Sequence, residues 1–508
     1  MATRHSNDTQ MITVSLWGKP IGTLSWNPRM QVSTFWFAPA YFQEPYDLAP
    51  ITYPKDLQSS AIGIPGLREP KIYQGLPPFL ADSLPDRWGN TLFDQWFADE
   101  GLHEKDKTPL TKLSFIGKRA IGALEFAPMI ENGFYENQTV RIDALYEQAK
   151  LVEQHLADTA IAHGEPLTRK ALMALGTSAG GRQMKAIVSI APDGSYHSGQ
   201  TSDDPTYKPC IIKFNTPEHA LSETEMAYHE MAVAAGIHMM PSRLIEVEGV
   251  RHFLTLRFDR RDGRKIFTQT LAAIDPDARS YEDLFRTARA LAVPKPEIDE
   301  LFRRAAFNVL ANNTDDHNKN FSFLMDKDGA WHLAPAYDMT FIIGTNGREP
   351  EKNHCMPIDG KVTDISESDL IQLGRNNAVR NPAGIIREVR KGIALFMEAA
   401  HRNGVDAFHI ELISKRLAEL NHDLGITVSG QAAFSFTSPD GTPVENVRFE
   451  RTESGNIHIM AQIGGRNVKY VVTPKKAIYQ EILKAGFNSM PNKKKEELAR
   501  KYLLGGGK

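Results

Sequence analysis

The sequence predicts an α+β fold that is divided into several domains. Segments rich in β-branched and aromatic residues dominate the beginning and the end of the chain, whereas residues 366–423 are mostly helical in pattern. The chain has 508 residues, which exceeds the size at which one hydrophobic core keeps growing. Apolar residues make up 41% and charged residues 24%, which is typical of globular proteins and excludes disordered and fibrous classes.

Charge, cysteine content and hydropathy limit the classes of function. A formal net charge of -3 gives no overall positive field, so any binding to DNA would depend on a partner. Cys210 and Cys355 cannot build a disulfide framework and fit a reducing cytosol. No apolar run approaches 18 residues and the start lacks the pattern of a signal peptide, so we expect a cytoplasmic protein. The sequence has no zinc-binding spacing and no G-x-S-x-G elbow.

The first predicted domain covers residues 10–140. Strand-forming segments within 11–37 are separated by Gly-Lys-Pro and Asn-Pro turns, which indicates a small β-meander. A helix is expected around 80–99, and the segment at 112–128 is typical of a turn that feeds a strand. At 142–156, apolar and charged residues recur at helical spacing, so a connecting helix is expected to lead into the next domain.

The second predicted domain covers residues 141–260 and begins with a glycine-rich turn before its first strand. Strands are expected at 186–190 and 209–214, joined across a Pro-Asp-Gly turn and a polar loop. Ser222 is expected to open a helix over 223–235. This order predicts a mixed sheet-and-helix domain.

The third predicted domain, at 261–424, is mainly helical. Helices are expected over 281–291 and 297–313, and the second runs directly into a polar loop. Helical patterns continue from residue 366 to residue 423.

The remaining segment, at 425–508, is predicted to form a separate β-rich appendage. Its strand formers are separated by Asp440-Gly441 and by a Ser-Gly-Asn turn at 454–456, which predicts hairpins. A charged helix is expected over 493–501.

The polar loop carries the strongest chemical signal in the sequence. The segment NNTDDHNKNFSFL at 312–324 places Asp315 five residues before Asn320, and LAPAYDMT at 333–340 supplies Asp338. In protein kinases an Asp orients the attacking hydroxyl and accepts its proton, while an Asn and a later Asp hold magnesium ions. The spacing from Asp315 to Asn320 equals that of the kinase catalytic loop. The alternative is that these residues only form turns.

Two cationic side chains lie within the same loop. His317 and Lys319 follow Asp315, where a cation would neutralise charge on the transferring phosphoryl group. The alternative for both is a solvated or hydrogen-bonded loop position.

Two further segments have the composition of a nucleotide site. The turn GTSAGGRQMKAIVSI at 176–190 has glycines that let backbone N–H groups approach phosphates, with Ser178 at its tip, although such turns are often only tight connections. Lys213 ends an apolar strand, where its ammonium would pair with phosphates or face water at a sheet edge. Its candidate ionic partners are Glu223, Glu225 and Glu230.

A fourth segment, TLRFDR at 255–260, is an apolar strand that ends in a short linker. In a two-lobed kinase, backbone groups at this place meet the adenine. The alternative is an ordinary strand end.

Assembled in this order, the motifs resemble the HipA family of serine/threonine kinases, the toxins of bacterial type II toxin-antitoxin systems. The resemblance covers roughly residues 10–423. Its motifs are SLPDRWGN at 83–90, IGALEFAP at 121–128, SAGGRQMK at 178–185, IIKF at 211–214, RFDR at 257–260, TDDHNKNFS at 314–322 and AYD at 336–338. The resemblance implies a two-lobed kinase-like core preceded by a small N-terminal subdomain.

The resemblance also implies roles for individual residues. Asp315 would be the catalytic base, and Asn320 and Asp338 would bind Mg²⁺. Lys213 would hold the phosphates of ATP below the glycine loop with Gly180 and Gly181, and the backbone from Leu256 to Phe258 would contact adenine. Ser178 matches the loop serine that members autophosphorylate.

Partners follow from the same resemblance. Known members phosphorylate an aminoacyl-tRNA synthetase and are held by a small HipB-like helix-turn-helix antitoxin that binds operator DNA. Two features depart from the family pattern: Arg182 is larger than the small residue common at its position, and the tail after Gly425 has no counterpart. A small-molecule kinase and an inactive scaffold or co-repressor are the alternative functions.

Overall fold

A computed structural model gives the fold of most of the chain. It describes residues 10–130, 138–155, 183–198, 204–216, 221–344, 347–421, 434–438, 440–451, 457–464, 466–473, 479 and 492–504. The chain divides into two compact units, the first made of 1–347 with 351–403 and the second of 348–350 with 404–508. The first three predicted domains, up to residue 403, therefore lie in one compact unit.

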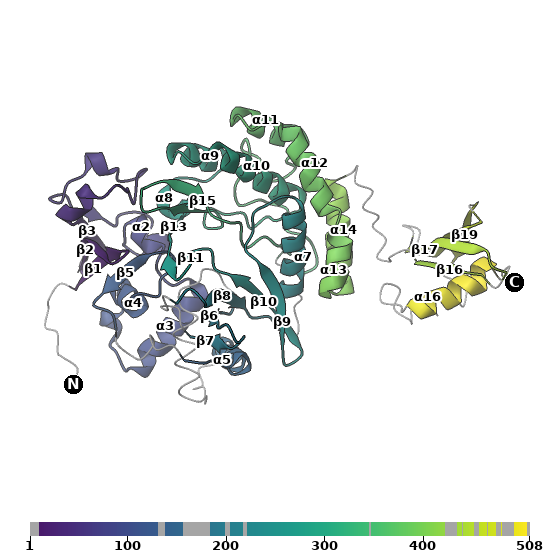
Figure 1. Ribbon diagram of the computed structural model, residues 1–508, viewed down its shortest axis with the longest axis horizontal. Helices are drawn as coiled ribbons and strands as arrows, with labels where there is room; N and C mark the ends of the chain where they lie inside the picture. Colours follow the sequence, from purple (N-terminus) through teal and green to yellow (C-terminus); the bar gives the residue numbers. More distant parts are fainter. Residues whose placement is uncertain are drawn as a thin grey trace. The chain divides into compact units, whose positions relative to one another are not determined.

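The first unit begins with a five-stranded antiparallel sheet, the N-terminal sheet, in the order β4-β3-β2-β1-β5 (Figure 1). Its strands are β1 (Met11–Leu16), β2 (Lys19–Asn27), β3 (Val32–Phe37), β4 (Ile64–Pro65) and β5 (Leu124–Ala127). Alternate side chains of a strand point to opposite faces, so Ile12, Val14 and Leu16 of β1 are buried together. The predicted meander at 11–37 is confirmed.

Helices and 3₁₀ turns lie between β3 and β6 in the chain. They are the 3₁₀ turns η1 (Pro39–Gln43), η2 (Lys55–Leu57) and η3 (Glu104–Asp106), and the helices α1 (Pro70–Tyr73), α2 (Pro78–Ala81), α3 (Arg87–Asp99), α4 (Pro109–Ile116) and α5 (Ile142–His155). The single helix expected around 80–99 is instead two, α2 and α3. Pro85 disfavours helical geometry at the residue before it, and Asp86 then caps α3 by accepting a hydrogen bond from the Gly89 amide.

A second five-stranded antiparallel sheet, the central sheet, has the order β7-β6-β8-β10-β9. Its strands are β6 (Lys185–Ile190), β7 (Tyr196–His197), β8 (Lys208–Lys213), β9 (Ser242–Val247) and β10 (Val250–Leu256). The strands expected at 186–190 and 209–214 are thus confirmed to within one residue. Helix α7 (Leu221–Ala234) packs on β9 and β10 (Figure 1), and it begins before the predicted start at Ser222.

The central sheet shares its hydrophobic core with the N-terminal part of the chain. Trp88 and Phe93 of α3 and Tyr146 of α5 lie in one buried cluster with Val188 of β6 and Ile212 of β8. Helix α3 of the N-terminal segment is therefore held against the central sheet.

The rest of the first unit is mainly helical, as expected. Its strands are β11 (Arg260–Arg261), β12 (Arg264–Lys265), β13 (Phe267–Thr270), β14 (Ser322–Met325) and β15 (Trp331–Leu333), and its helices are α8 (Leu271–Ile274), α9 (Tyr281–Ala290), α10 (Lys295–Leu310), α11 (Glu367–Asn376), α12 (Pro382–Ile393) and α13 (Phe396–Asn403). The predicted helices at 281–291 and 297–313 correspond to α9 and α10. Residues 311–321, the α10–β14 loop, connect α10 to the small sheet β13-β14-β15.

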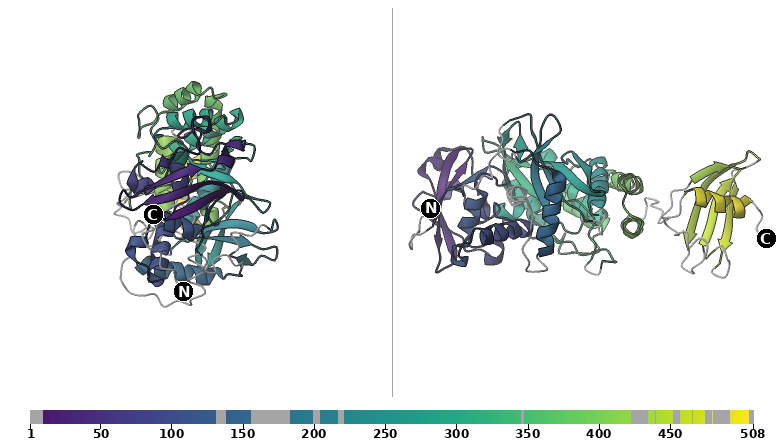
Figure 2. Two further views of the ribbon diagram at one scale, coloured as in Figure 1. Left: turned by 90° about the vertical axis from the view of Figure 1, so that its left-hand side faces the viewer. Right: turned by 90° about the horizontal axis from the view of Figure 1, so that it is seen from below.

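The second unit contains α14 (Ala407–Leu420) and a four-stranded antiparallel sheet in the order β16-β17-β18-β19. Its strands are β16 (Phe434–Thr437), β17 (Pro443–Arg451), β18 (Ile457–Ile463) and β19 (Arg466–Val472). Figure 2 shows α16 (Asn492–Ala499) across this sheet, and Val447, Ile459 and Leu498 share its core. A π-helical segment (Arg500–Leu504) follows.

The predicted β-rich appendage and its charged terminal helix are present. Gly441 has φ +84° at the turn between β16 and β17, as expected of a hairpin glycine. The predicted turn at 454–456 lies outside the described residues. Within the part of the chain that the structure describes, no helix has the length and apolar character needed to cross a membrane.

Candidate active site

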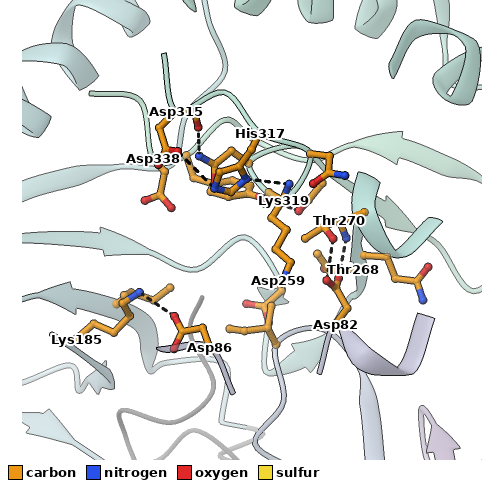
Figure 3. Close-up of a pocket in the computed structure, with 18 of the residues that line it drawn as sticks. Asp82, Asp86, Lys185, Asp259, Thr268, Thr270, Asp315, His317, Lys319 and Asp338 are labelled. Carbon is orange, nitrogen blue, oxygen red and sulfur yellow. Dashed lines mark hydrogen bonds and ion pairs between the residues drawn. The ribbon is translucent and has the colours of Figure 1, made fainter. Parts of the chain in front are cut away.

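A cavity of about 920 Å³ lies within the first unit (Figure 3). Its wall includes residues from the α2–α3 segment, from β6, β8 and β10 of the central sheet, and from the α10–β14 loop. Every predicted site residue within the described ranges lines it: Lys213, Leu256, Phe258, Asp315, His317, Lys319, Asn320 and Asp338. Residues more than 100 positions apart in sequence are therefore gathered around one space.

Lys213, at the end of β8, is the centre of an ionic cluster. Its Nζ lies 2.5 Å from Oε1 of Glu225 on α7 and also contacts Oδ1 of Asp338. Burial alone would lower the pKa of Lys213, but the two carboxylates raise it well above its ordinary value. Lys213 therefore faces the cavity as a cation and does not lie at a water-facing sheet edge.

The structure distinguishes the three candidate partners of Lys213. Glu225 is the one in contact. Glu223 instead accepts a hydrogen bond from Asn215 at 3.0 Å. Glu230 pairs with Arg402 at 2.5 Å. Since α7 has a period of 3.6 residues, Glu225 lies on a different face of the helix from Glu223 and Glu230.

Asp338 is an ionised carboxylate with an unusual backbone. Its φ is +52°, a conformation that Asp and Asn tolerate better than most residues. Burial raises its pKa, but the charges of Lys213 and Lys185 outweigh burial and leave the pKa below its ordinary value. Asp338 is therefore negative at neutral pH.

The α10–β14 loop brings Asp315 and Asn320 together. Nδ2 of Asn320 donates a hydrogen bond to the main-chain oxygen of Asp315 at 2.6 Å. Because the amide nitrogen is used in this way, Oδ1 of Asn320 is the atom that can bind a cation. The Asp315 side chain is half-exposed, and His317 Nε2 lies 3.8 Å from its Oδ1. Partial burial raises the pKa of Asp315. The nearby His317 lowers this pKa, whereas the negative charge of Asp338 raises it further.

Lys319 is placed differently from His317. Its backbone N–H donates to His317 Nδ1 at 3.1 Å, and its side chain extends away from Asp315 into the cavity (Figure 3). Burial raises the pKa values of Asp82 and Asp86. The positive charge of Lys319 lowers both pKa values, but by less than burial raises them. Lys319 thus faces the N-terminal wall of the cavity.

Asp316, next to Asp315, forms a buried network that the sequence did not single out. Its carboxylate accepts hydrogen bonds from the Tyr281 hydroxyl at 2.7 Å and from the Cys355 amide at 2.8 Å, and it pairs with His354 Nδ1 at 2.8 Å. The Asp316 side chain is completely inaccessible to solvent. This network fixes the loop and leaves Asp315 free to face the cavity.

The TLRFDR segment serves two purposes. Leu256 and Phe258 line the cavity, and the Phe258 ring packs 5.7 Å from that of Tyr337. Asp259 instead holds the N-terminal part of the chain: it accepts a hydrogen bond from the Gly122 amide at 2.7 Å while Arg257 pairs with it at 2.7 Å. Burial alone would raise the pKa of Asp259, but the charges of Arg257 and Arg260 outweigh burial and lower this pKa below its ordinary value.

Two more carboxylates of the N-terminal wall, Asp82 and Asp86, contact residues from other walls of the cavity. Asp82 accepts hydrogen bonds from the backbone and the hydroxyl of Thr270 at 2.8 and 2.7 Å. Asp86 lies 3.5 Å from the ammonium of Lys185. Burial lowers the pKa of Lys185, and Asp86 partly compensates. The motif SLPDRWGN contains Asp86, but nothing in the sequence indicates its partner.

The remaining predicted residues cannot be placed. Ser178, Gly180 and Gly181, with Arg182, lie outside the described residues. Cys210 is buried and Cys355 exposed, and both are free thiols.

The donor set fits a hard divalent cation only in part. Among the described residues, no group of three or more His, Cys, Asp or Glu side chains could hold a metal by itself. Magnesium, however, is usually bound by one or two carboxylates together with substrate phosphates and water. Ionised Asp338 and the Oδ1 of Asn320 are ligands of that kind.

Comparison with known proteins is consistent with this geometry. The HipA N-terminal domain model matches residues 12–127, and the HipA-like C-terminal domain model matches residues 177–396. The solved structure of HipA from Shewanella oneidensis MR-1, in complex with HipB and operator DNA, is similar with a TM-score of 0.55 and 18% identity; the match covers 82% of this chain and 97% of that chain. At this identity the similarity concerns the fold, which is two-lobed and kinase-like.

A curated relative is similar in sequence. The putative kinase Y4mE of Sinorhizobium fredii is 27% identical over 179 residues, which is 32% of this chain and 40% of that protein. The match therefore spans less than half the length of the relative.

Proposed function

The chain belongs to the HipA family, and on that basis we propose that it is an ATP- and Mg²⁺-dependent serine/threonine protein kinase. One observation carries the proposal: Lys213 contacts both Glu225 and Asp338 in the cavity that also contains Asp315 and Asn320. A kinase needs this combination, because its catalysis consists of positioning the phosphates and stabilising charge.

In this proposal each side chain has a defined role. Asp315 accepts the proton of the attacking hydroxyl, and its raised pKa brings it closer to the pH at which a base works. His317, 3.8 Å away, orients Asp315 and adds positive charge when protonated. Lys213 binds phosphate oxygens, and Glu225 keeps its ammonium in place.

Asp338 and Asn320 would hold Mg²⁺, which would neutralise charge on the phosphates. Lys319 faces the opposite wall of the cavity, so its contribution is to attract anionic groups into the site. The glycine turn with Gly180 and Gly181 is proposed to cover the phosphates.

Adenine is proposed to contact the backbone after β10. The amides of Leu256 and Arg257 already donate to the carbonyls of Pro241 and Pro209, at 3.1 and 2.9 Å. We therefore assign the adenine edge to the Leu256 carbonyl and the Phe258 amide.

Regulation and partners belong to the same proposal. Ser178 is proposed as an autophosphorylation site, so Ser178→Ala is expected to remain active without silencing itself. The structure of the Shewanella relative contains HipB and operator DNA. A HipB-like antitoxin, and operator DNA through it, are proposed as partners of this chain, with an aminoacyl-tRNA synthetase as a candidate substrate.

An inactive scaffold is the alternative from another class. It would have no need for a buried lysine between two carboxylates, because removing charges from water is costly unless they are used or fully compensated. A small-molecule kinase is the alternative within the enzymes.

The test is product analysis with labelled ATP. The purified chain is incubated with γ-labelled ATP, Mg²⁺ and a cell extract, and protein and metabolite fractions are separated. Label on protein serine supports the proposal. Label only on metabolites supports the small-molecule alternative, and no transfer together with no ATP binding supports the scaffold.

A further inference from the structure

We propose that residues 57–72, called the 57–72 segment, form a docking surface for the protein that this chain phosphorylates. This inference rests on the proposed function and deepens it, because it concerns how an intact acceptor protein is held while one of its serines enters the cavity. Apolar side chains of the acceptor pack on Leu57, Ile62, Leu67 and Ile72 of this segment.

The first argument is the exposure of these four side chains. Leu57 is 72% exposed and Leu67 65%, and Ile62 and Ile72 are also exposed. Among the described residues, thirteen large apolar side chains are exposed, and four of them belong to this one segment. Single exposed apolar side chains are normal in folded proteins, whereas a group of them marks a surface that contacts another molecule.

The second argument is the rigid support of Leu67. The amide of the preceding residue, Gly66, donates to the Ser33 carbonyl of β3 at 2.9 Å, and the Ser33 amide donates to the Gly75 carbonyl at 2.8 Å. Gly66 also packs so closely on the Gly75 carbonyl that a Cβ would have no room there. Leu67 is therefore presented by a fixed backbone, which reduces the entropy lost when a partner binds.

The third argument is that the 57–72 segment reaches the mouth of the cavity. Glu69, Lys71 and Ile72 line the cavity, and Ile72 is one of the four exposed apolar side chains. The carboxylate of Glu69 pairs with Arg279, another cavity residue, at 2.8 Å, and both side chains are about half-exposed. Side chains that line a cavity and also face solvent lie at its opening. The apolar surface therefore continues into the proposed active site.

The fourth argument is the short path of hydrogen bonds from this opening to the α10–β14 loop. The Tyr73 hydroxyl, directly after the 57–72 segment, donates to the Ala272 carbonyl at 3.0 Å. The Ala272 amide donates to the main-chain oxygen of Asn318 at 3.2 Å. Asn318 lies three residues after Asp315. These contacts fix the docking surface relative to the proposed catalytic base.

The combination of features favours a protein as the occupant. Arg68 pairs with Asp277 and Glu69 pairs with Arg279, so charged pairs lie in the sequence between the apolar residues Leu67 and Ile72. Protein interfaces likewise combine apolar contacts with a polar rim. A nucleotide or a small metabolite has no use for an apolar surface outside the cavity. A protein acceptor can cover this surface and insert a serine through the opening toward Asp315, as phosphoryl transfer requires.

The experiment compares an intact acceptor with a short peptide. The acceptor is the protein that the wild type labels most strongly in a cell extract with γ-labelled ATP, and the peptide contains only the phosphorylated serine and its nearest neighbours. Leu67→Glu and Leu57→Glu are compared with the wild type and with Leu395→Glu, an exposed leucine between α12 and α13. Because all three leucines are exposed, none of these substitutions should lower the thermal unfolding temperature.

The expected result is a change in KM for the intact acceptor only. We expect this KM to rise roughly 10- to 100-fold in Leu67→Glu and in Leu57→Glu, the range for a leucine that the complex buries. The kcat should stay within about twofold, because the surface does not contact the reacting groups. The peptide does not reach the 57–72 segment, so its kcat/KM and the affinity for ATP should also stay within about twofold. Leu395→Glu should match the wild type.

Two results would overturn the inference by showing that the acceptor does not dock here. One is an unchanged KM for the intact acceptor in both variants. The other is an equal loss for the acceptor and the peptide, which would indicate a defect in folding or catalysis. Light scattering tests a second copy of this chain as the occupant. A wild-type dimer that Leu67→Glu dissociates, with the KM for the acceptor unchanged, would assign the surface to that copy and overturn the inference.

Failure of the proposed function gives a different result. If the wild type labels no protein in the extract, the proposed function fails, and the inference fails with it. If the wild type and both variants phosphorylate the acceptor and the peptide equally well, only the inference fails.

Discussion

The two sides of the cavity hold their carboxylates in different ways. Beside the central sheet, Asp338, which follows β15, is held by the charge of Lys213 on β8, and Lys213 also contacts Glu225. In the α10–β14 loop, Asp315 has few contacts, whereas the carboxylate of its neighbour Asp316 is buried and hydrogen-bonded to four residues, Tyr281, His354, Cys355 and Met356. On the Lys213 side, the same charged side chains stabilise the structure and take part in the proposed chemistry. In the α10–β14 loop, Asp316 stabilises the loop and the preceding residue, Asp315, takes part in the proposed chemistry. Substitutions should therefore affect the two sides differently.

The largest effect is expected for Asp338→Asn. It removes the proposed metal ligand and one partner of Lys213, so phosphoryl transfer should fall at least about 1,000-fold. Asn tolerates the positive φ of this position, so folding should be preserved. Asp262, an exposed residue with φ +51°, offers a matched control, and Asp262→Asn should have wild-type activity. Normal turnover by Asp338→Asn would contradict the assignment.

A comparison of Asp315 and Asp316 comes next in size. Asp315→Ala should reduce transfer by about 10²- to 10⁴-fold and leave the thermal unfolding temperature unchanged. Asp316→Ala should lower the free energy of unfolding by about 2–4 kcal/mol, because the Tyr281 hydroxyl and the Cys355 amide lose their buried acceptor. If instead Asp315→Ala is the destabilised variant, the division of roles within the loop is wrong.

A smaller effect is expected on the pH dependence of kcat/KM. The pKa of Asp315 is raised, so its active, deprotonated form should be lost on acidification already above pH 3.9, the ordinary value for Asp. His317 opposes that rise, so His317→Asn should move the acid limb of the profile to higher pH. An unchanged limb in this variant would show that another group titrates there.

Asp338 should behave in the opposite sense in stability measurements. Its pKa is lowered in the folded state, so its contribution to stability is present above about pH 3.9 and is lost as the pH falls through the lower folded value. Acid unfolding of Asp338→Asn should therefore be less steep than that of the wild type below pH 4.

The smallest effect is expected from truncation after Asn421, which removes the sheet β16-β17-β18-β19 and α16. Among the residues that the structure describes, none that lines the cavity lies beyond residue 403, so ATP affinity should remain within about twofold of the wild type. A larger loss would show that the second unit contributes to the site.

Local patterns in the sequence were enough to predict much of the fold. Segments of β-branched and aromatic residues separated by turns predicted the meander at 11–37, and the helical periodicity after residue 281 predicted α9 and α10. The sequence also indicated three candidate site residues, Asp315 and Asn320 in the loop and Lys213 at the end of β8. Their spacing and their positions on the predicted elements can be seen in the sequence alone.

Other features depend on long-range contacts and could not be predicted. The choice of Glu225 among three glutamates depends on which face of α7 meets β8. Asp86 and Lys185 are 99 positions apart, and only the packing of α3 on the central sheet brings them together. Asp316 likewise obtains partners from α9 and from residues 354–355, which no local pattern links to the loop.

The central claim is that the cavity transfers phosphate from ATP to serine. The most direct measurement is intact-mass and peptide mass spectrometry of the wild type and Asp338→Asn after incubation with ATP and Mg²⁺. The account predicts added phosphate on serine, at Ser178, in the wild type only. Absence of phosphate from both proteins, with no detectable binding of ATP, would contradict it.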